Sequence, residues 1–183
     1  MKHNFKISYG KNVYDKKEIS AVIKTLNNST QMGKSVSKFE KKFSKFFKKK
    51  YALMVNSGTS AITLALNVLN VSNGDEVITP CLNFGTALSS IINCGAKPIL
   101  VDINRETLQI NEKLIEKKIN KKTKVLLIPN LIGNIPNWKK IYKIAKDNNL
   151  KIIEDSADTL GATINKKSTG IYSDISITSF YGS

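Results

Sequence analysis

The chain has 183 residues, of which 41% are hydrophobic, a mean hydropathy of -0.20 and a formal net charge of +15 at pH 7. This length and apolar content favour one folded domain with a buried core and exclude an extensively disordered chain. No apolar run approaches the roughly 20 residues of a membrane-spanning helix, and residues 1–10 lack the apolar segment of a signal peptide. We therefore expect a cytoplasmic protein with no membrane partner.

The high positive charge raises the question of nucleic-acid binding. The charge comes almost entirely from lysine, since Arg105 is the only arginine. Base recognition favours the forked arginine side chain, so we interpret the lysines as a solvated surface and expect no nucleic-acid partner. His3 is the only histidine, and Cys81 and Cys94 are the only cysteines. These counts argue against a histidine-based triad, a disulfide scaffold or a zinc cluster, and we expect reduced thiols and no metal.

Two amphipathic helices are predicted near the start of the chain, over residues 16–28 and 36–47, because apolar side chains recur there at helical spacing. Four phenylalanines of the second helix fall on one face. They are Phe39, Phe43, Phe46 and Phe47. Such a stripe is typical of a helix that packs against a core, and we prefer that interpretation to a platform for stacked bases.

Predicted strands and helices alternate along the rest of the chain. Strands are predicted over 51–55, 76–80, 97–102, 124–129, 150–155 and 174–180, and helices over 60–69, 85–94, 112–118 and 137–149. This alternation, with nearly continuous apolar strands, predicts an α/β fold whose mostly parallel sheet is covered by helices on both faces. Ligands of such folds bind at the carboxyl ends of the strands. The residues at which the predicted strands end are therefore the candidates for a binding site.

The predicted strand over 51–55 is followed by small residues, "NSGTSA". Gly58 permits a tight turn into the next helix. The hydroxyl groups of Ser57, Thr59 and Ser60 can either cap that helix or help its free N–H groups to bind an anion such as phosphate. Both interpretations stay open at this point. The spacing of a P-loop is absent.

An aromatic residue follows the next strand. The stretch "CLNFGT", residues 81–86, places Phe84 at the start of a predicted helix. A flat ring in this position could stack on a planar ligand. Taken alone, a single aromatic residue is better explained by packing in the core.

The strand "KIIED", residues 151–155, ends in Glu154 and Asp155, and Asp158 follows shortly after. A partly buried acid must be paired or hydrogen-bonded, or its pKa rises. Opposite a protonated heterocyclic nitrogen, Asp155 would stay ionised and would make a pyridinium ring an electron sink. A helix start for phosphate, a stacking ring and this aspartate, in that order, together describe a site for pyridoxal 5'-phosphate (PLP).

The sequence resembles the DegT/DnrJ/EryC1/StrS sugar aminotransferases, which have the PLP fold type I, or aspartate aminotransferase-like, fold. The resemblance runs from about Tyr9 to the last residue, through "NSGTSAITLAL", "GDEVITPCLNF", "GAKPILVDI", "LIPNLIGN", "IIEDSADTLGA" and "YSDISITSF". It implies an incomplete three-layer α/β/α large domain over residues 1–183, with helices in 1–50, a cofactor-binding part in 51–183 and no small C-terminal domain. Members of the family are dimers whose active sites include residues of the partner.

The resemblance implies a set of cofactor-binding residues. They are Gly58, Thr59, Ser60, Phe84, Asp155, Asp158 and Ser179. The phosphate of PLP, or of pyridoxamine 5'-phosphate (PMP), would be bound by residues 58–60 and Ser179. Phe84 would stack on the ring, and Asp155 would pair with the ring nitrogen.

Two activities follow from the resemblance. The first, which we favour, is transfer of an amino group from glutamate or glutamine to a nucleotide-linked keto-sugar in polysaccharide or deoxysugar biosynthesis. Asp158, which would face the 3-hydroxyl of the cofactor, stands where these aminotransferases usually carry Gln or His, and Asn130 stands where many carry His. With "NLIGN" and "SFYGS", Asp158 resembles the branch that uses PMP to remove the 3-hydroxyl of CDP-4-keto-6-deoxyglucose.

The catalytic residue of the family is a lysine, replaced by histidine in the dehydrases, and it lies five residues after the serine equated with Ser179. That is position 184, one past the last residue, so we expect no catalytic residue within the chain. Lys166 and Lys167 are expected in a turn between strands and not in the active site. A catalytically inactive cofactor-binding or interaction module is a further alternative, so whether the chain is an enzyme stays open here.

Overall fold

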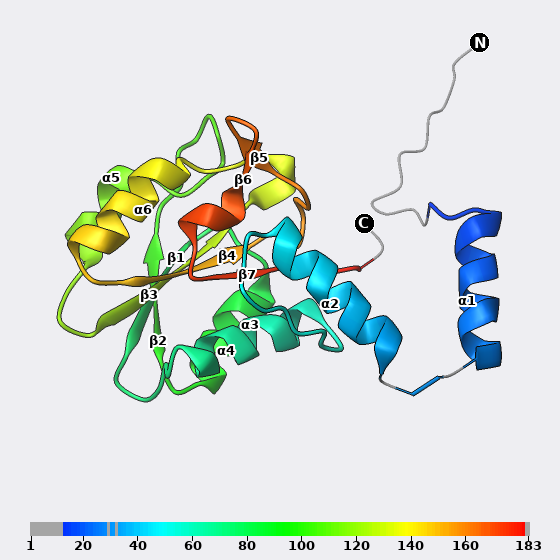
Figure 1. The fold of residues 1–183 in the computed structure, drawn as a ribbon. Coiled ribbons are helices and arrows are strands. Elements are labelled where there is room, and N and C mark those ends of the chain that lie inside the picture. Colours follow the sequence, from blue (N-terminus) through cyan, green and yellow to red (C-terminus); the bar gives the residue numbers. More distant parts are fainter. Residues whose placement is uncertain (1–12, 29, 32, 182–183) are drawn as a thin grey trace, which may run out of the picture.

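A parallel sheet forms the centre of the structure, a computed structural model that describes residues 13–28, 30–31 and 33–181 (Figure 1). His3 and Tyr9 lie outside these residues. The strands are β1 (Glu76–Pro80), β2 (Lys97–Val101), β3 (Thr123–Pro129), β4 (Lys151–Asp155) and β7 (Ile175–Ile177). They lie in the order β2-β1-β3-β4-β7, and each pairing is parallel. Because every strand runs the same way, all the carboxyl ends meet at one edge of the sheet.

Helices cover both faces of this sheet (Figure 1). The helices of the described residues are α1 (Lys16–Asn28), α2 (Lys34–Phe46), α3 (Gly58–Val68), α4 (Gly85–Asn93), α5 (Glu112–Ile115) and α6 (Trp138–Asp147), with the 3-10 helices η1 (Glu116–Lys118), η2 (Leu131–Gly133) and η3 (Thr169–Tyr172). Of these, α1 has no buried residue and stands apart from the sheet (Figure 1). One face packs against α3 and α4, and the other packs against α6. The predicted helix over 112–118 is thus divided into α5 and η1.

Side chains of the central strands alternate between two hydrophobic clusters. In β3, Val125 and Leu127 pack with residues of α3 and α4, whereas Leu126 and Ile128 pack with residues of α6. All four side chains are fully buried. A strand with this pattern is covered on both faces, which confirms the predicted three-layer α/β/α architecture.

The strand predicted over 51–55 is wrong. This segment is an irregular connection in which Tyr51 and Leu53 are 76% and 67% exposed. Its Met54 N–H donates to Glu40 Oε1 of α2 at 2.9 Å instead of to a neighbouring strand. An apolar run forms a strand only where a sheet edge is available to pair with it, and the sequence does not show where that edge lies.

The last predicted strand, 174–180, is shorter in the structure. β7 ends at Ile177, which is paired with Asp155, the last residue of β4. The chain continues past Ile177 without a strand partner. The length of an edge strand is therefore limited by the neighbour that it pairs with.

A short hairpin joins β4 to β7. Its strands are β5 (Thr163–Ile164) and β6 (Lys167–Ser168), which pair antiparallel. Asn165 and Lys166 form the turn between them with φ angles of 51° and 64°, as a two-residue hairpin turn requires. The expected turn is confirmed at Lys166, whereas Lys167 is the first residue of β6.

The phenylalanine stripe of α2 packs toward the body of the protein only in part. Phe47, just after the helix, is buried, and Phe39 and Phe43 are half-buried. Phe46 is 46% exposed. The prediction of a core-facing stripe therefore holds for three of these rings and fails for the fourth.

The end of α2 is fixed to η3. The Lys49 ammonium donates to the Gly170 carbonyl at 2.7 Å. Burial lowers the pKa of Lys49, and the nearby carboxylates of Glu154 and Asp174 partly oppose this effect. The backbone of Gly170 in turn lies directly against the Phe47 carbonyl. These contacts hold α2 in a defined position over the end of the sheet.

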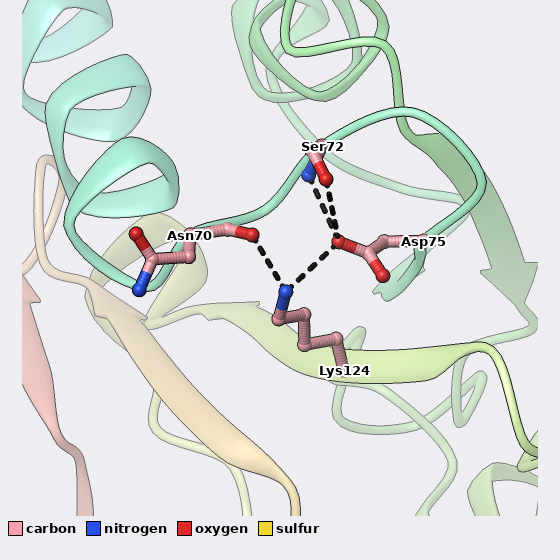
Figure 2. Close-up of polar contacts among 4 residues, drawn as sticks. All are labelled: Asn70, Ser72, Asp75 and Lys124. Carbon is pink, nitrogen blue, oxygen red and sulfur yellow. Dashed lines mark hydrogen bonds and ion pairs between the residues drawn. The ribbon is translucent and has the colours of Figure 1, made fainter.

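At the amino edge of the sheet, a polar cluster ties the connection between α3 and β1 to the start of β3 (Figure 2). Lys124 Nζ lies 3.0 Å from Asp75 Oδ2 and donates to the Asn70 carbonyl at 2.6 Å. Ser72 N–H donates to the same Asp75 oxygen at 2.9 Å. Desolvation works to raise the pKa of Asp75, but the Ser72 N–H and the Lys124 ammonium outweigh it, so the pKa falls below its ordinary value.

We predict that Gly170→Ala destabilises the protein by about 2 kcal/mol or more, a magnitude typical of overpacking against backbone. A Cβ at this position would lie 2.2 Å from the Phe47 carbonyl oxygen, and backbone cannot yield as a side chain can. Urea unfolding monitored by circular dichroism measures the change. The control is Gly85→Ala, because a Cβ there has nothing within 4 Å. Equal stability of the two variants would contradict the packing described for Gly170.

We predict that Asp75→Asn destabilises the protein by about 1 kcal/mol near neutral pH, the upper range for a partly exposed ion pair. The folded pKa of Asp75 lies below 3.8, so its contribution is complete above that pH and disappears as the pH falls through the folded value. Unfolding in urea should therefore show a difference from wild type that shrinks in acid. A difference from wild type that is equally large at neutral and at acidic pH would contradict the assigned ion pair.

Candidate functional site

The two acidic residues that end β4 point to opposite faces of the sheet. Ile153 packs in the cluster that contains α3 and α4, and Ile152 packs in the cluster that contains α6. Because side chains alternate along a strand, Asp155 faces the layer of α3 and α4, and Glu154 faces the layer of α6. The adjacent carboxylates therefore lie in different environments.

Glu154 is fully buried within a network of hydrogen bonds. Its oxygens accept bonds from one amide and several hydroxyl groups, which belong to Asn130, Ser156, Thr169, Ser173 and Ser176. The Trp138 indole N–H donates to Asn130 Oδ1 at 2.8 Å, so the network reaches α6. Both carboxylate oxygens are satisfied within the protein, which assigns Glu154 and Asn130 to the structure and not to ligand binding.

Asp155 is also buried, with 6% of its surface exposed, but it has a different environment. Its Oδ1 accepts the Ala157 N–H at 3.0 Å. Among the described residues, no lysine or arginine forms an ion pair with it. Burial raises the pKa of Asp155 to about 6, the Ala157 N–H works against the rise, and the charges of Asp158 and Glu154 add to it. A buried carboxylate in this state would be stabilised by a cationic ligand.

The first residues of α3 offer donors for an anion at the same edge of the sheet. Ser57 caps the helix, because its hydroxyl oxygen accepts the Ser60 N–H at 3.1 Å. In the described part of the chain, no acceptor is found for the backbone N–H of Gly58 or of Thr59. The capping interpretation of this segment is thus confirmed, and it leaves free the two N–H groups that anion binding needs.

Ser179 lies against the start of α3. A Cβ built on Gly58 would lie 3.1 Å from Ser179 Cβ and 3.4 Å from its Oγ, so a side chain larger than that of glycine would be tightly packed here. The Thr178 hydroxyl donates to the Ser156 carbonyl at 3.0 Å, which ties this part of the chain to the residue after Asp155. Gly58, Ser179 and Asp155 are thereby brought to the same edge of the sheet.

Phe84 precedes α4 and is 69% exposed, which excludes packing in the core. The Asn83 side chain fixes its backbone, with Oδ1 accepting the Phe84 N–H at 2.7 Å and Nδ2 donating to Thr79 at 3.0 Å. A bond of 3.1 Å between the hydroxyls of Thr63 and Ser90 joins α3 to α4. The exposed ring therefore stands at the carboxyl edge, on the face of the sheet toward which Asp155 points.

Asp158 is exposed and bonds to the loop after β3. Its Oδ2 accepts the Ile132 N–H at 3.4 Å, and Thr159 Oγ1 accepts the Gly133 N–H at 2.9 Å. Ile132 has φ 49° and ψ 42°, a conformation that β-branched residues rarely adopt. We did not predict this loop contact from the sequence. The glycine and amides of "NLIGN" were its only local signal.

No group of three or more metal-ligating side chains occurs within 13–28, 30–31 and 33–181. Across the same residues, no helix is long and apolar enough to cross a bilayer. Both cysteines are free thiols.

Comparison with known proteins identifies relatives of this chain. GDP-perosamine synthase of Vibrio cholerae is 35% identical over 150 residues, which are 82% of this chain and 41% of that protein. GDP-4-keto-6-deoxy-D-mannose 3-dehydratase of Yersinia pseudotuberculosis is 34% identical over 166 residues, 87% of this chain and 42% of that protein. The PLP form of a Streptococcus pneumoniae protein assigned as a sugar aminotransferase superposes with a TM-score of 0.88 at 29% identity, covering 96% of this chain and 49% of that one.

The chain spans about two fifths of the length of the curated relatives that it matches. The sequence profile of the DegT/DnrJ/EryC1/StrS aminotransferase family matches residues 12–183, almost the whole chain. The architecture also agrees with the solved PLP fold type I structures. This protein therefore belongs to the DegT/DnrJ/EryC1/StrS aminotransferase family.

Proposed function

We propose that the chain forms the cofactor-binding part of a PLP-dependent sugar-nucleotide aminotransferase. The whole protein would transfer an amino group from glutamate or glutamine to a nucleotide-linked keto-sugar in polysaccharide or deoxysugar biosynthesis, as a cytoplasmic homodimer. The observation that carries this proposal is Asp155, a buried carboxylate that lacks a cationic partner among the described residues. A carboxylate that is buried without an opposite charge destabilises the fold unless a ligand supplies that charge.

The residues at the edge fit both ends of the cofactor. Gly58 and Thr59 present backbone N–H groups for a phosphate, and Ser179 supplies a hydroxyl beside them. Asp155 supplies a carboxylate for a protonated ring nitrogen, and Phe84 supplies an exposed aromatic face. When bound, PLP supplies an electron-withdrawing ring that stabilises negative charge on the substrate. Asp155 would keep the proton on the ring nitrogen, and the α3 residues would keep the ring in place.

A dehydratase is the second candidate, and Asp158 is the observation that favours it. The position carries an acid in place of the Gln or His expected for aminotransferases, and this acid is bonded to the "NLIGN" loop. A dehydratase is also among the similar proteins. The two activities differ in their product. Incubation of the full-length protein with glutamate and a nucleotide-linked keto-sugar would yield an amino sugar from an aminotransferase and a deoxy sugar from a dehydratase.

We predict that Asp155→Asn stabilises the ligand-free protein above pH 6 by up to about 3 kcal/mol. The pKa of Asp155 rises from 3.8 to about 6, so the folded state holds its proton more tightly than the unfolded chain does. Wild-type stability therefore falls as the pH rises through this window, and the amide variant avoids the loss. Urea unfolding at several pH values measures it. An advantage of the variant that persists unchanged below pH 3.8 would contradict the assigned cause.

We predict that Asp155→Asn binds PMP at least about tenfold more weakly than the wild-type protein does, because the variant loses a charge-assisted hydrogen bond to the ring nitrogen. PMP is the better probe, since it lacks the aldehyde with which surface lysines would react. Titration of the ligand-free protein, followed by PMP fluorescence, gives the Kd. Asp75→Asn is the matched control, because it makes the same change at the opposite edge of the sheet and should leave the Kd unchanged. An Asp155→Asn protein that binds PMP as wild type does would refute the proposed site.

A further inference from the structure

The position of Ser179 is not set by strand pairing. β7 ends at Ile177, and the Thr178 hydroxyl makes the last bond between this strand and the segment after β4. Ser179 lies beyond that bond, and it nevertheless lies so close to Gly58 that a Cβ built there would be 3.1 Å from Ser179 Cβ, a tight contact. Another contact must therefore hold this residue against the start of α3.

The next residue supplies such a contact. The Phe180 ring packs edge-on against the rings of Phe39 and Phe43, with centroid distances of 5.6 and 5.5 Å and interplanar angles of 67° and 80°. Those two rings stack on each other at 4.3 Å. Figure 1 shows the chain after β7 passing beside α2. Phe180 is 57% exposed, so its ring lies outside the core and packs against these two rings at the surface.

α2 is itself fixed to the elements that surround the site. Phe47 is buried at its end, and Lys49 bonds to the Gly170 carbonyl. In the middle of the helix, Glu40 accepts the Met54 N–H, which holds the segment that leads into α3. The aromatic pair on α2 thus has a defined position relative to the α3 start.

We infer that Phe180 is a positioning residue, which holds the Ser179 hydroxyl at the start of α3 through its contacts with Phe39 and Phe43. The inference rests on the proposed function, in which Ser179 binds the cofactor phosphate. Phe180 touches no reacting group, and it acts only through the residue before it. From the sequence we predicted that the phenylalanine stripe of α2 packs against the core, and this pattern gives no sign of a link to the site.

Affinities for PMP and for pyridoxamine, which lacks the phosphate, test this inference. Phe180→Leu should weaken PMP binding about fivefold, the effect of losing roughly one aromatic pair. Binding of pyridoxamine should not change. In a Ser179→Ala background, Phe180→Leu should have no further effect on PMP. Phe180→Tyr keeps the ring and should restore the affinity. The matched control is Phe46→Leu. Phe46 lies on α2 with Phe39 and Phe43, and its ring contacts Phe43 and Phe47.

The outcomes separate the inference from the proposed function. Equal weakening of PMP and pyridoxamine by Phe180→Leu, or a full effect that remains in the Ser179→Ala background, would overturn the positioning role while leaving the cofactor site intact. The same result from Phe46→Leu as from Phe180→Leu would also overturn it. A wild-type protein that binds neither ligand would overturn the proposed function and, with it, this inference.

Discussion

The alternation of side chains along β4 determines which of two adjacent acids is available to a ligand. Glu154 faces α6 and is surrounded by hydroxyl and amide donors, whereas Asp155 faces α3 and α4 with a single backbone N–H. A shift of the strand by one residue would exchange the faces of the two acids. Glu154 would then lose the amide and hydroxyl donors that bind it, which opposes the shift because a buried carboxylate must be hydrogen-bonded.

The parallel sheet explains why the candidate site residues lie together. Every strand ends at the same edge, and each helix that follows a strand begins there, with its N–H groups directed outward. Asp155 ends β4, Phe84 follows β1, and the α3 start is joined to the chain beyond β7 through Gly58 and Ser179. Residues more than a hundred positions apart are thus collected without any long-range sequence signal. α2 also contacts this edge, since its Phe39 and Phe43 rings pack against Phe180, the residue after Ser179.

Several features of this edge are unfavourable for the ligand-free fold. Asp155 is desolvated without a cationic partner, and Ile132 holds a strained backbone conformation while its side chain is 65% exposed. Neither feature improves the packing of the core. Natural proteins keep such destabilising features mainly at functional sites, where a bound ligand can compensate for them. This agrees with the proposed ligand, which carries a cationic ring nitrogen at one end and an anionic phosphate at the other.

The sequence by itself determined the α/β class, nearly all the helices and strands, the family and the set of residues at the strand ends, because periodicity, glycines and capping residues are local signals. It did not determine that residues 51–55 stay outside the sheet or that Phe84 is exposed. Nor did it determine that the Asn130 amide is hydrogen-bonded to Glu154. Those outcomes depend on which neighbour lies beside each residue. Only the tertiary structure decided which layer each of Glu154 and Asp155 faces and that Phe180 meets α2, since both follow from packing between distant segments.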